Sequence, residues 1–126
     1  FPQGWETILL VEDEEVIRKL LQKMLSQQGY NLLETCDGED ALRVFTRHRD
    51  SIHLVVTDVV MPNMSGTELV RNLRVLCPET KVLYVSGHPE KATELGSELG
   101  PNADLLYKPF KREALLVKVR NLLDES

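Results

Sequence analysis

Side chains that bind metal ions and phosphoryl groups follow or end four apolar runs of this chain. Glu12 and Asp13 come after the first run, and Asp58, Ser86 and Lys108 mark the ends of three others. Two carboxylates about 4 Å apart repel each other by about 4 kcal/mol at an effective dielectric of about 20, so a cation is expected among the acids. Oxygen ligands favour a hard ion such as Mg²⁺. Each residue alone has an ordinary structural explanation, but the set predicts a site for a metal and a phosphoryl group.

Five short apolar runs, the third of them rich in β-branched residues, are typical of buried strands and would position these side chains. Helical periodicity fills the segments between the runs. This alternation predicts an α/β fold with a doubly wound parallel sheet and right-handed crossovers. Because the carboxyl ends of parallel strands meet at one edge of a sheet, the acids should converge there. The predicted strands are Thr7–Val11, Asn31–Thr35, His53–Asp58, Lys81–Val85 and Leu105–Tyr107.

Five helices are expected between and after these strands. An apolar stripe at helical spacing marks the first, and Gly29 is placed to end it. The fourth is the weakest, because Gly96 interrupts its apolar positions. The expected segments are Val16–Leu25, Glu39–His48, the stretch from the capping box of Ser65 and Glu68 to Leu73, His88–Leu99 and Lys111–Leu123.

The composition limits the classes of protein that this chain can represent. Its 126 residues suffice for one domain, and 42% hydrophobic and 28% charged residues are typical of globular proteins. No apolar run approaches the roughly 20 residues of a membrane span, and no signal peptide is visible, so we expect a cytoplasmic protein without membrane contact. A net charge of −5 without a basic stripe argues against direct nucleic acid binding. Cys36 and Cys77 match no metal-ligand spacing and are expected to be reduced.

The order of the motifs resembles the receiver domain of two-component response regulators. The resemblance covers nearly the whole chain, from about Thr7 to Leu123. It implies a flavodoxin-like fold with strand order 2-1-3-4-5 and five helices, and a phosphorelay function in signal transduction. The motifs that carry it are Glu12-Asp13, Asp58 followed by Met61-Pro62-Asn63-Met64-Ser65-Gly66, Ser86-Gly87 and Lys108-Pro109-Phe110.

The resemblance implies roles for the acids at matching positions. Asp58 would take a phosphoryl group from the phosphohistidine of a histidine kinase or histidine-phosphotransfer protein, forming an aspartyl phosphate. Asp13, the Asp58 side chain and the Val60 carbonyl would bind Mg²⁺. Glu12 would act at longer range through water on the metal. The domain would promote its own phosphorylation and dephosphorylation without being a turnover enzyme alone.

Two further residues have roles implied by the resemblance. Lys108 would pair with one phosphoryl oxygen and Ser86 would hydrogen-bond another, which agrees with the need of phosphoryl transfer for positioning and charge neutralisation. In the resting state Lys108 is expected to form an ion pair with Asp58. The peptide bond between Lys108 and Pro109 is expected to be cis, as in the family.

Two positions bear on how strong and how lasting the signal would be. Many receivers carry an aromatic residue three positions before the lysine, whose rotation accompanies movement of the Ser or Thr hydroxyl, but this chain has Leu105 there. Tyr107 lies on the same face by the two-residue period of a strand and could partly substitute. Val60 can neither position water nor donate a hydrogen bond from its side chain, which predicts slow-to-moderate loss of the phosphoryl group.

Three alternative functions share this architecture. A nucleotide or flavin module would need a glycine- or hydroxyl-rich phosphate loop after the first strand, where Glu12-Asp13-Glu14 would repel phosphate. A phosphohydrolase of the haloacid dehalogenase kind would need a second acid at the position of Val60. A phosphorylation-independent protein-interaction module of the same fold stays open as the main alternative.

The resemblance also suggests how the chain is organised. Residues 1–6 are expected to form a linker or tail, residues 7–123 the receiver domain and residues 124–126 a C-terminal tail. Because the chain starts at Phe1 rather than Met, excision from a longer polypeptide is expected. The opening Thr7–Glu14 and Ser86-Gly87-His88 are similar to receivers at the C-terminus of hybrid sensor histidine kinases. A single-domain regulator and the N-terminal part of a transcription factor stay open, and output would pass through a partner, a phosphorylation-dependent dimer or the parent chain.

Overall fold

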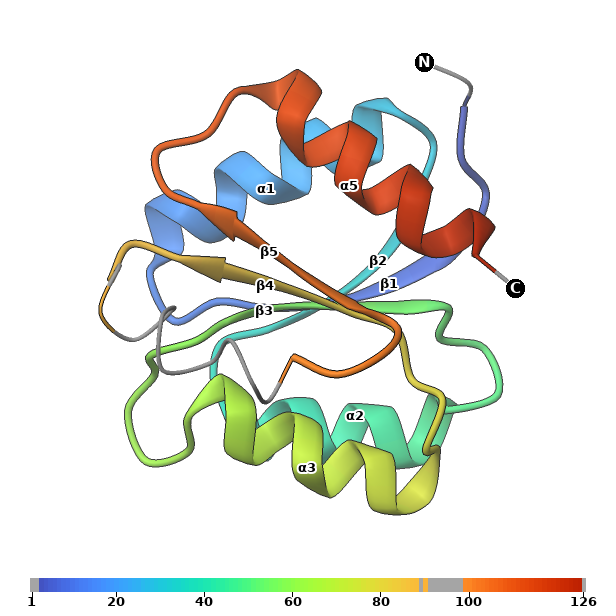
Figure 1. Cartoon of the computed structure of the whole chain (residues 1–126), viewed down its shortest axis with the longest axis vertical. Helices are drawn as coiled ribbons and strands as arrows, with labels where there is room; N and C mark the ends of the chain where they lie inside the picture. The colour runs from blue at the N-terminus through green and yellow to red at the C-terminus, as the bar shows by residue number, and fades with distance from the viewer. Residues whose placement is uncertain (1–2, 89, 91–98, 126) are drawn as a thin grey trace.

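Five parallel strands form one sheet with helices on both faces in the computed structural model of the chain (Figure 1). The structure describes residues 3–88, 90 and 99–125. The strands lie in the order β2-β1-β3-β4-β5, and each neighbouring pair is parallel. The predicted doubly wound α/β fold and its strand order are therefore confirmed. The strands are β1 (Thr7–Val11), β2 (Asn31–Thr35), β3 (Leu54–Asp58), β4 (Val82–Ser86) and β5 (Ala103–Tyr107).

Two apolar layers join the helices to the sheet, because side chains alternate between the two faces along each strand. In β1, Ile8 and Leu10 face α1 (Glu15–Gln27) and α5 (Arg112–Asp124). Leu9 and Val11 face α2 (Gly38–His48) and α3 (Gly66–Leu76). All residues of β3 and β4 are buried, as expected for the central strands of a parallel sheet.

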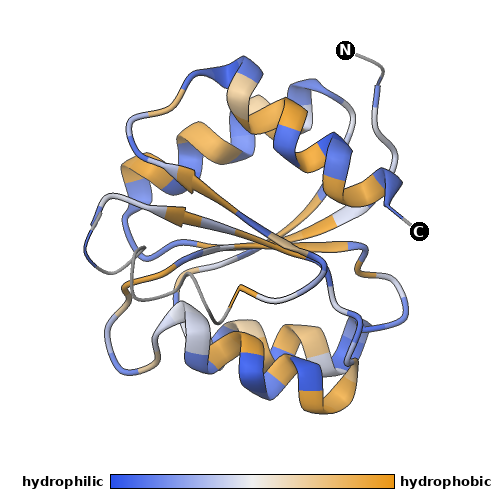
Figure 2. Ribbon diagram, viewed as in Figure 1, coloured by the Kyte–Doolittle hydropathy of each residue, from blue (hydrophilic) through white to orange (hydrophobic). Residues whose placement is uncertain are grey.

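The hydropathy of the chain follows these layers. Figure 2 shows mostly hydrophobic strands at the centre, and helices on which hydrophobic and hydrophilic residues alternate. Each helix therefore buries one stripe and leaves the other to solvent. No helix within the described residues is both long enough and apolar enough to cross a membrane.

Local sequence signals set the ends of the helices. Ser65 Oγ accepts a hydrogen bond from the Glu68 N–H at 3.2 Å, so the predicted N-cap of α3 is confirmed. Gly29 follows α1 with a φ of +99°, a left-handed conformation that suits glycine. Asp37 accepts from the Asp40 N–H at 2.7 Å and caps α2, which therefore begins at Gly38 rather than at Glu39.

The expected helix His88–Leu99 falls largely on residues 89 and 91–98, outside the described residues. The structure describes four α-helices in the remaining chain. β5 starts at Ala103, before the predicted start at Leu105. Leu105 is partly buried in the layer under α2 and α3, and the residue paired with it across the sheet is the buried Tyr84. Tyr107 pairs with Ser86 and is 51% exposed.

The segment before β1 is bound to the end of α5. The Glu6 carboxylate is buried, and both of its oxygens accept hydrogen bonds from Arg120. The same guanidinium donates to Asp124 at 2.9 Å and to the Tyr30 hydroxyl at 3.3 Å. The four side chains Glu6, Tyr30, Arg120 and Asp124 are called the Arg120 cluster below. The segment before β1 and the end of α5, which supply three of these residues, lie on the side of the molecule away from the carboxyl ends of the strands (Figure 1).

Gly66 allows the start of α3 to approach the end of β3. A Cβ atom added there would lie 2.1 Å from the Asp58 carbonyl oxygen, which is backbone and must move. We therefore expect Gly66→Ala to destabilise the domain by about 1–3 kcal/mol or more in urea unfolding. Gly87→Ala is the matched control, because its Cβ would make ordinary contact with Lys108 at 3.7 Å. Equal stability of the two variants would contradict this explanation.

Candidate functional site

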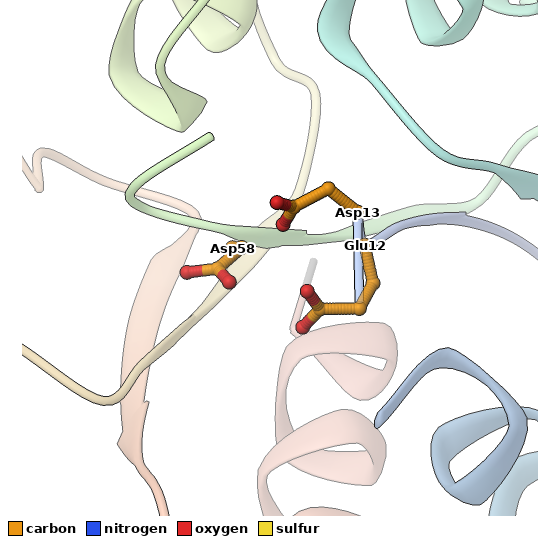
Figure 3. A group of neighbouring side chains, drawn as sticks. All are labelled: Glu12, Asp13 and Asp58. Carbon is orange, nitrogen blue, oxygen red and sulfur yellow. The ribbon is translucent and has the colours of Figure 1, made fainter. Parts of the chain in front are cut away.

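Three carboxylates from two strands meet at the carboxyl edge of the sheet (Figure 3). Glu12 and Asp13 follow β1, and Asp58 is the last residue of β3. One oxygen from each lies within 4.8 Å of the others. Glu12 and Asp58 are buried, whereas Asp13 is exposed. The structure thus brings together the three acids that the sequence pattern placed in one crevice.

Lys108 reaches into the same edge from the end of β5. Its Nζ donates to Glu12 Oε1 at 2.9 Å and to Asp58 Oδ2 at 3.1 Å. The expected ion pair with Asp58 is confirmed, and Glu12 is a second partner that the sequence did not indicate. The peptide bond between Lys108 and Pro109 is cis, as expected. The ammonium group therefore neutralises part of the charge of the three acids.

Burial and charge shift the proton affinity of these groups. Burial raises the pKa of Glu12 to about 7, and the Asp58 charge adds to the shift, although the Lys108 hydrogen bond opposes it. Burial lowers the pKa of Lys108, but its hydrogen bond to Glu12 and the charges of Asp58 and Glu12 outweigh this and raise it above its usual value. Lys108 therefore stays charged, and Glu12 can be either protonated or ionised near neutral pH.

The raised pKa of Glu12 predicts how stability depends on pH without metal. Since the folded state holds this proton more tightly than the unfolded state, stability should fall as pH rises from about 4.5 to about 7. Urea unfolding in chelator should show this fall for the wild type and a smaller one for Glu12→Gln. Glu39→Gln, at an exposed position of α2, should behave as the wild type. Identical pH profiles for wild type and Glu12→Gln would contradict the prediction.

Ser86 lies at the end of β4 with its side chain fully buried. Its hydroxyl donates to the His88 carbonyl oxygen at 3.2 Å and accepts from the His88 N–H at 3.0 Å. Its backbone carbonyl accepts from the Lys108 N–H at 2.8 Å, which ties the ends of β4 and β5 together. In this structure the hydroxyl is therefore engaged with His88 rather than with the acids.

The acids open onto a pocket of about 560 Å³, called the acid pocket below. Val60, at its mouth, is 38% exposed and donates its N–H to Asp58 Oδ1 at 3.3 Å. A larger pocket of about 600 Å³ lies at the opposite edge between the ends of α2 and α3, but its lining is mostly apolar. The polar groups, rather than the size, make the acid pocket the functional candidate. It is lined by Asp13, Glu14, Asp58, Val60, Met61, Pro62, Gly87, His88 and Lys108.

The donor set of the acid pocket fits Mg²⁺. Carboxylate oxygens converge there, and Mg²⁺ usually binds through one or two carboxylates and keeps several waters. An exposed acid beside two buried ones leaves a side open to water, which Mg²⁺ usually retains. Asp13, Asp58 and the nearby Val60 backbone are thus suited to hold the ion, with Glu12 bound to Lys108 behind them.

Sequence reasoning missed two residues that shape the site. Arg18, on α1, donates from Nη1 to the Glu12 carbonyl oxygen at 3.0 Å and holds the turn after β1. His88 forms the two backbone bonds to the Ser86 hydroxyl and lines the acid pocket. Two sequence features could have pointed to these residues. Arg18 lies one helical turn into α1, and the imidazole of His88 lies two residues after Ser86.

Comparisons with known proteins identify one family for this chain. The family model described as response regulator receiver domain matches residues 8–120. The chain is 35% identical over 123 residues to sensor kinase CckA of Brucella abortus, covering 98% of this chain and 13% of that protein. It is 36% identical over 118 residues to the transcriptional regulatory protein CssR of Bacillus subtilis, covering 93% of this chain and 51% of that protein. The chain thus spans at most about half of these relatives.

A similar fold is found in a crystal structure of the response regulator protein TrrA of Thermotoga maritima in complex with Mg²⁺ and BeF. The TM-score is 0.82 at 31% sequence identity, and the match covers 93% of this chain and 98% of that one. The Mg²⁺ and BeF belong to that protein. The family match and the fold match therefore both cover nearly the whole chain.

Proposed function

Because this chain belongs to the response regulator receiver domain family, we propose that Asp58 is its phosphoacceptor. Receiver domains of two-component systems take phosphoryl groups from histidine kinases or phosphotransfer proteins, so the donor is the phosphohistidine of one of these. The observation that carries the proposal is the convergence of Asp58, Asp13 and the Lys108 ammonium at one edge of the sheet. The residues of this chain that phosphoryl acceptance requires thus all lie at this edge of the sheet.

The transfer step is a displacement at phosphorus. One Asp58 carboxylate oxygen attacks, a P–O bond forms, the P–N bond to the donor histidine breaks, and the imidazole leaves with the bond's electron pair. No general base is needed because the carboxylate is already ionised. Lys108 lies within 3.1 Å of Asp58 and is placed to pair with a phosphoryl oxygen, which stabilises the charge of the transition state.

Receiver domains bind Mg²⁺ at their acidic pocket, and in this chain Asp13, Asp58 and the Val60 carbonyl would hold the ion. Glu12 would contribute through water. When bound, Mg²⁺ supplies positive charge against the phosphoryl oxygens. The residues present fit this role, as the donor set of the acid pocket indicates.

The Ser86 hydroxyl supports a conformational signal. For Ser86 to bind a phosphoryl oxygen, it must give up the bond that it donates to the His88 carbonyl. The segment after β4 then loses one of its two ties. Leu105 is partly buried and Tyr107 is exposed, so the change would be passed on without an aromatic ring at the usual position.

The proposal also covers the domain bounds, the location, the parent protein and the output. The receiver domain would span 7–123, between a linker at 1–6 and a tail at 124–126, in a cytoplasmic protein. The parent could be a hybrid histidine kinase, and output would use a partner or a phosphorylation-dependent dimer rather than direct contact with nucleic acid or membrane. The alternative is a phosphorylation-independent interaction module of the same fold.

Phosphorylation by acetyl phosphate with Mg²⁺, read by intact mass, tests the proposal. The wild type should gain the mass of one phosphoryl group, and the gain should disappear in chelator and in Asp58→Asn. Asp104→Asn changes an acid on β5 outside the acid pocket and should keep the adduct. An unmodified wild type that is folded, also with histidine-phosphorylated donor proteins, would favour the interaction module.

A further inference from the structure

We propose that Arg18, on α1, positions the metal ligand Asp13 and thereby sets the affinity of the acid pocket for Mg²⁺. Arg18 acts through the peptide between Glu12 and Asp13, whose carbonyl oxygen it binds. It is a positioning residue rather than a catalytic one, because it contacts neither the ion nor the phosphoryl group. This role rests on the proposed function, since it needs Asp13 to hold the ion.

The Asp13 carboxylate is not held by a neighbouring group. In the part of the chain that the structure describes, it forms no hydrogen bond and no ion pair. It is exposed and points towards Asp58, with an oxygen of each within 4.8 Å of the other (Figure 3). Glu12 and Asp58, in contrast, are both bound by Lys108. The backbone that carries Asp13 therefore decides where its oxygens lie.

Hydrogen bonds on both sides fix the turn that carries Asp13. The Glu12 N–H donates to the Thr35 carbonyl at 3.2 Å, so strand pairing holds the chain up to Glu12. The next peptide is held by Arg18 Nη1, which donates to the Glu12 carbonyl at 3.0 Å. The Arg18 N–H donates to the Glu14 carbonyl at 2.9 Å, and the Glu14 N–H to Glu12 Oε2 at 3.2 Å. The side chain of Arg18 thus ties the peptide before Asp13 to α1.

Arg18 follows four consecutive acids, Glu12–Glu15, but forms an ion pair with none of them among the described residues. Glu15 pairs instead with Lys19, at 3.0 Å. A guanidinium that bound Asp13 directly would compete with Mg²⁺ for its carboxylate. Because Arg18 donates to a backbone carbonyl, the full negative charge of Asp13 stays available to a metal ion. Arg18 therefore holds the turn without occupying the ligand.

The charge of Arg18 and its hydrogen bond have opposite effects on Mg²⁺ affinity. A cation beside the acid pocket repels Mg²⁺, so removal of the charge alone would strengthen binding of the ion. Removal of the bond to the Glu12 carbonyl would let the turn and the Asp13 oxygens move. Because Mg²⁺ demands near-octahedral geometry, a ligand that is held less firmly binds it more weakly. Weaker binding after loss of Arg18 therefore identifies positioning.

Titration calorimetry with Mg²⁺ on the unphosphorylated domain tests the proposal. The dissociation constant of Arg18→Met should be about tenfold higher than that of the wild type. Arg18→Lys should lie between them, since lysine keeps the charge and can donate one hydrogen bond to the carbonyl. With acetyl phosphate, the Mg²⁺ concentration that gives half the maximal rate of adduct formation should rise by the same factor. The rate at saturating Mg²⁺ should match that of the wild type.

Lys19→Met is the matched control, because it removes a cation from the next residue of α1, where the ammonium pairs with Glu15 on the exposed surface. Its affinity for Mg²⁺ should equal or slightly exceed that of the wild type. An affinity as low as that of Arg18→Met would contradict the proposal, because the loss would then not depend on the bond to the Glu12 carbonyl.

The remaining outcomes separate the role of Arg18 from the proposed function. Unchanged or tighter Mg²⁺ binding by Arg18→Met overturns that role and leaves the proposed function intact, even if urea unfolding in chelator shows a loss of stability. If Arg18→Met does not fold, wild-type affinity in Arg18→Lys overturns the role in the same way. Failure of the folded wild type to bind Mg²⁺ would instead contradict the metal site of the proposed function, and the role of Arg18 with it.

Discussion

Lys108→Met should lower the rate of phosphoryl adduct formation by about a hundredfold and destabilise the metal-free domain by about 3 kcal/mol. Methionine keeps the length of the side chain and removes the ammonium group. The kinetic loss follows because that group lies 3.1 Å from Asp58, where the phosphoryl oxygens would gather. The loss of stability follows because Glu12 and Asp58 are both buried and would face each other without a cation.

Two measurements separate these effects. Intact mass gives the initial rate with acetyl phosphate, and urea unfolding in chelator gives stability. Mg²⁺ should restore part of the stability of Lys108→Met, because a second cation then lies among the acids. Lys118→Met is the control, since Lys118 pairs with Asp104 at 3.1 Å where both side chains are about a third or more exposed, and should cost at most about 1 kcal/mol. Equal losses of unfolding free energy in the two variants would contradict this prediction, because burial of the charges at the acid pocket would then add nothing.

Arg120→Met should destabilise the domain by about 3 kcal/mol without changing the chemistry of the acid pocket. The guanidinium is the cation of the Arg120 cluster, and its loss leaves the Glu6 carboxylate buried without a charged partner. Arg43→Met is the matched control, because Arg43 pairs with Asp40 on the exposed surface of α2. Urea unfolding at neutral pH gives both values. Adduct formation with acetyl phosphate should be unchanged in both variants.

The pH dependence of this defect has a definite sign. Burial raises the pKa of Glu6, but the hydrogen bonds from Arg120, backbone hydrogen bonds that include the Trp5 N–H, and the Arg120 charge together hold the pKa below its ordinary value of 4.5. The stabilisation is therefore complete above about pH 4.5 and is lost as pH falls through the lower pKa of the folded state. The difference between wild type and Arg120→Met should shrink in acid, as Glu6 becomes protonated in both. A difference that grows in acid would contradict this assignment.

The fold could be predicted because its signals are local and repeated. Each strand is a short apolar run, and each described helix has a stripe or a cap that can be recognised without knowing its neighbours, as Ser65 shows for α3. Parallel strands then bring Glu12, Asp13 and Asp58 to one edge, whatever the details of the packing. The motif order added the strand order and the cis bond before Pro109, which periodicity alone does not give.

Contacts between distant charged residues could not be predicted in the same way. Nothing near Glu6 in the sequence indicates that Arg120 lies beside it, since that contact depends on how α5 crosses the end of the sheet. The partnership of Lys108 with Glu12 as well as Asp58 depends on which rotamer the lysine adopts among several acids. The tie between Ser86 and His88 is local, but its importance emerges only once the acid pocket is seen beside it.

The position of the Arg120 cluster has a practical consequence for handling the protein. The segment before β1 and the end of α5 lie on the side away from the acids, so a surface linkage or fluorescent tag attached beyond either would leave the acid pocket open to its donor (Figure 1). The same geometry sets a limit on trimming. A chain shortened to start at Thr7 would lack Glu6, and Arg120 would lose one of its two carboxylate partners. Immobilised or truncated versions of the domain should therefore keep Glu6.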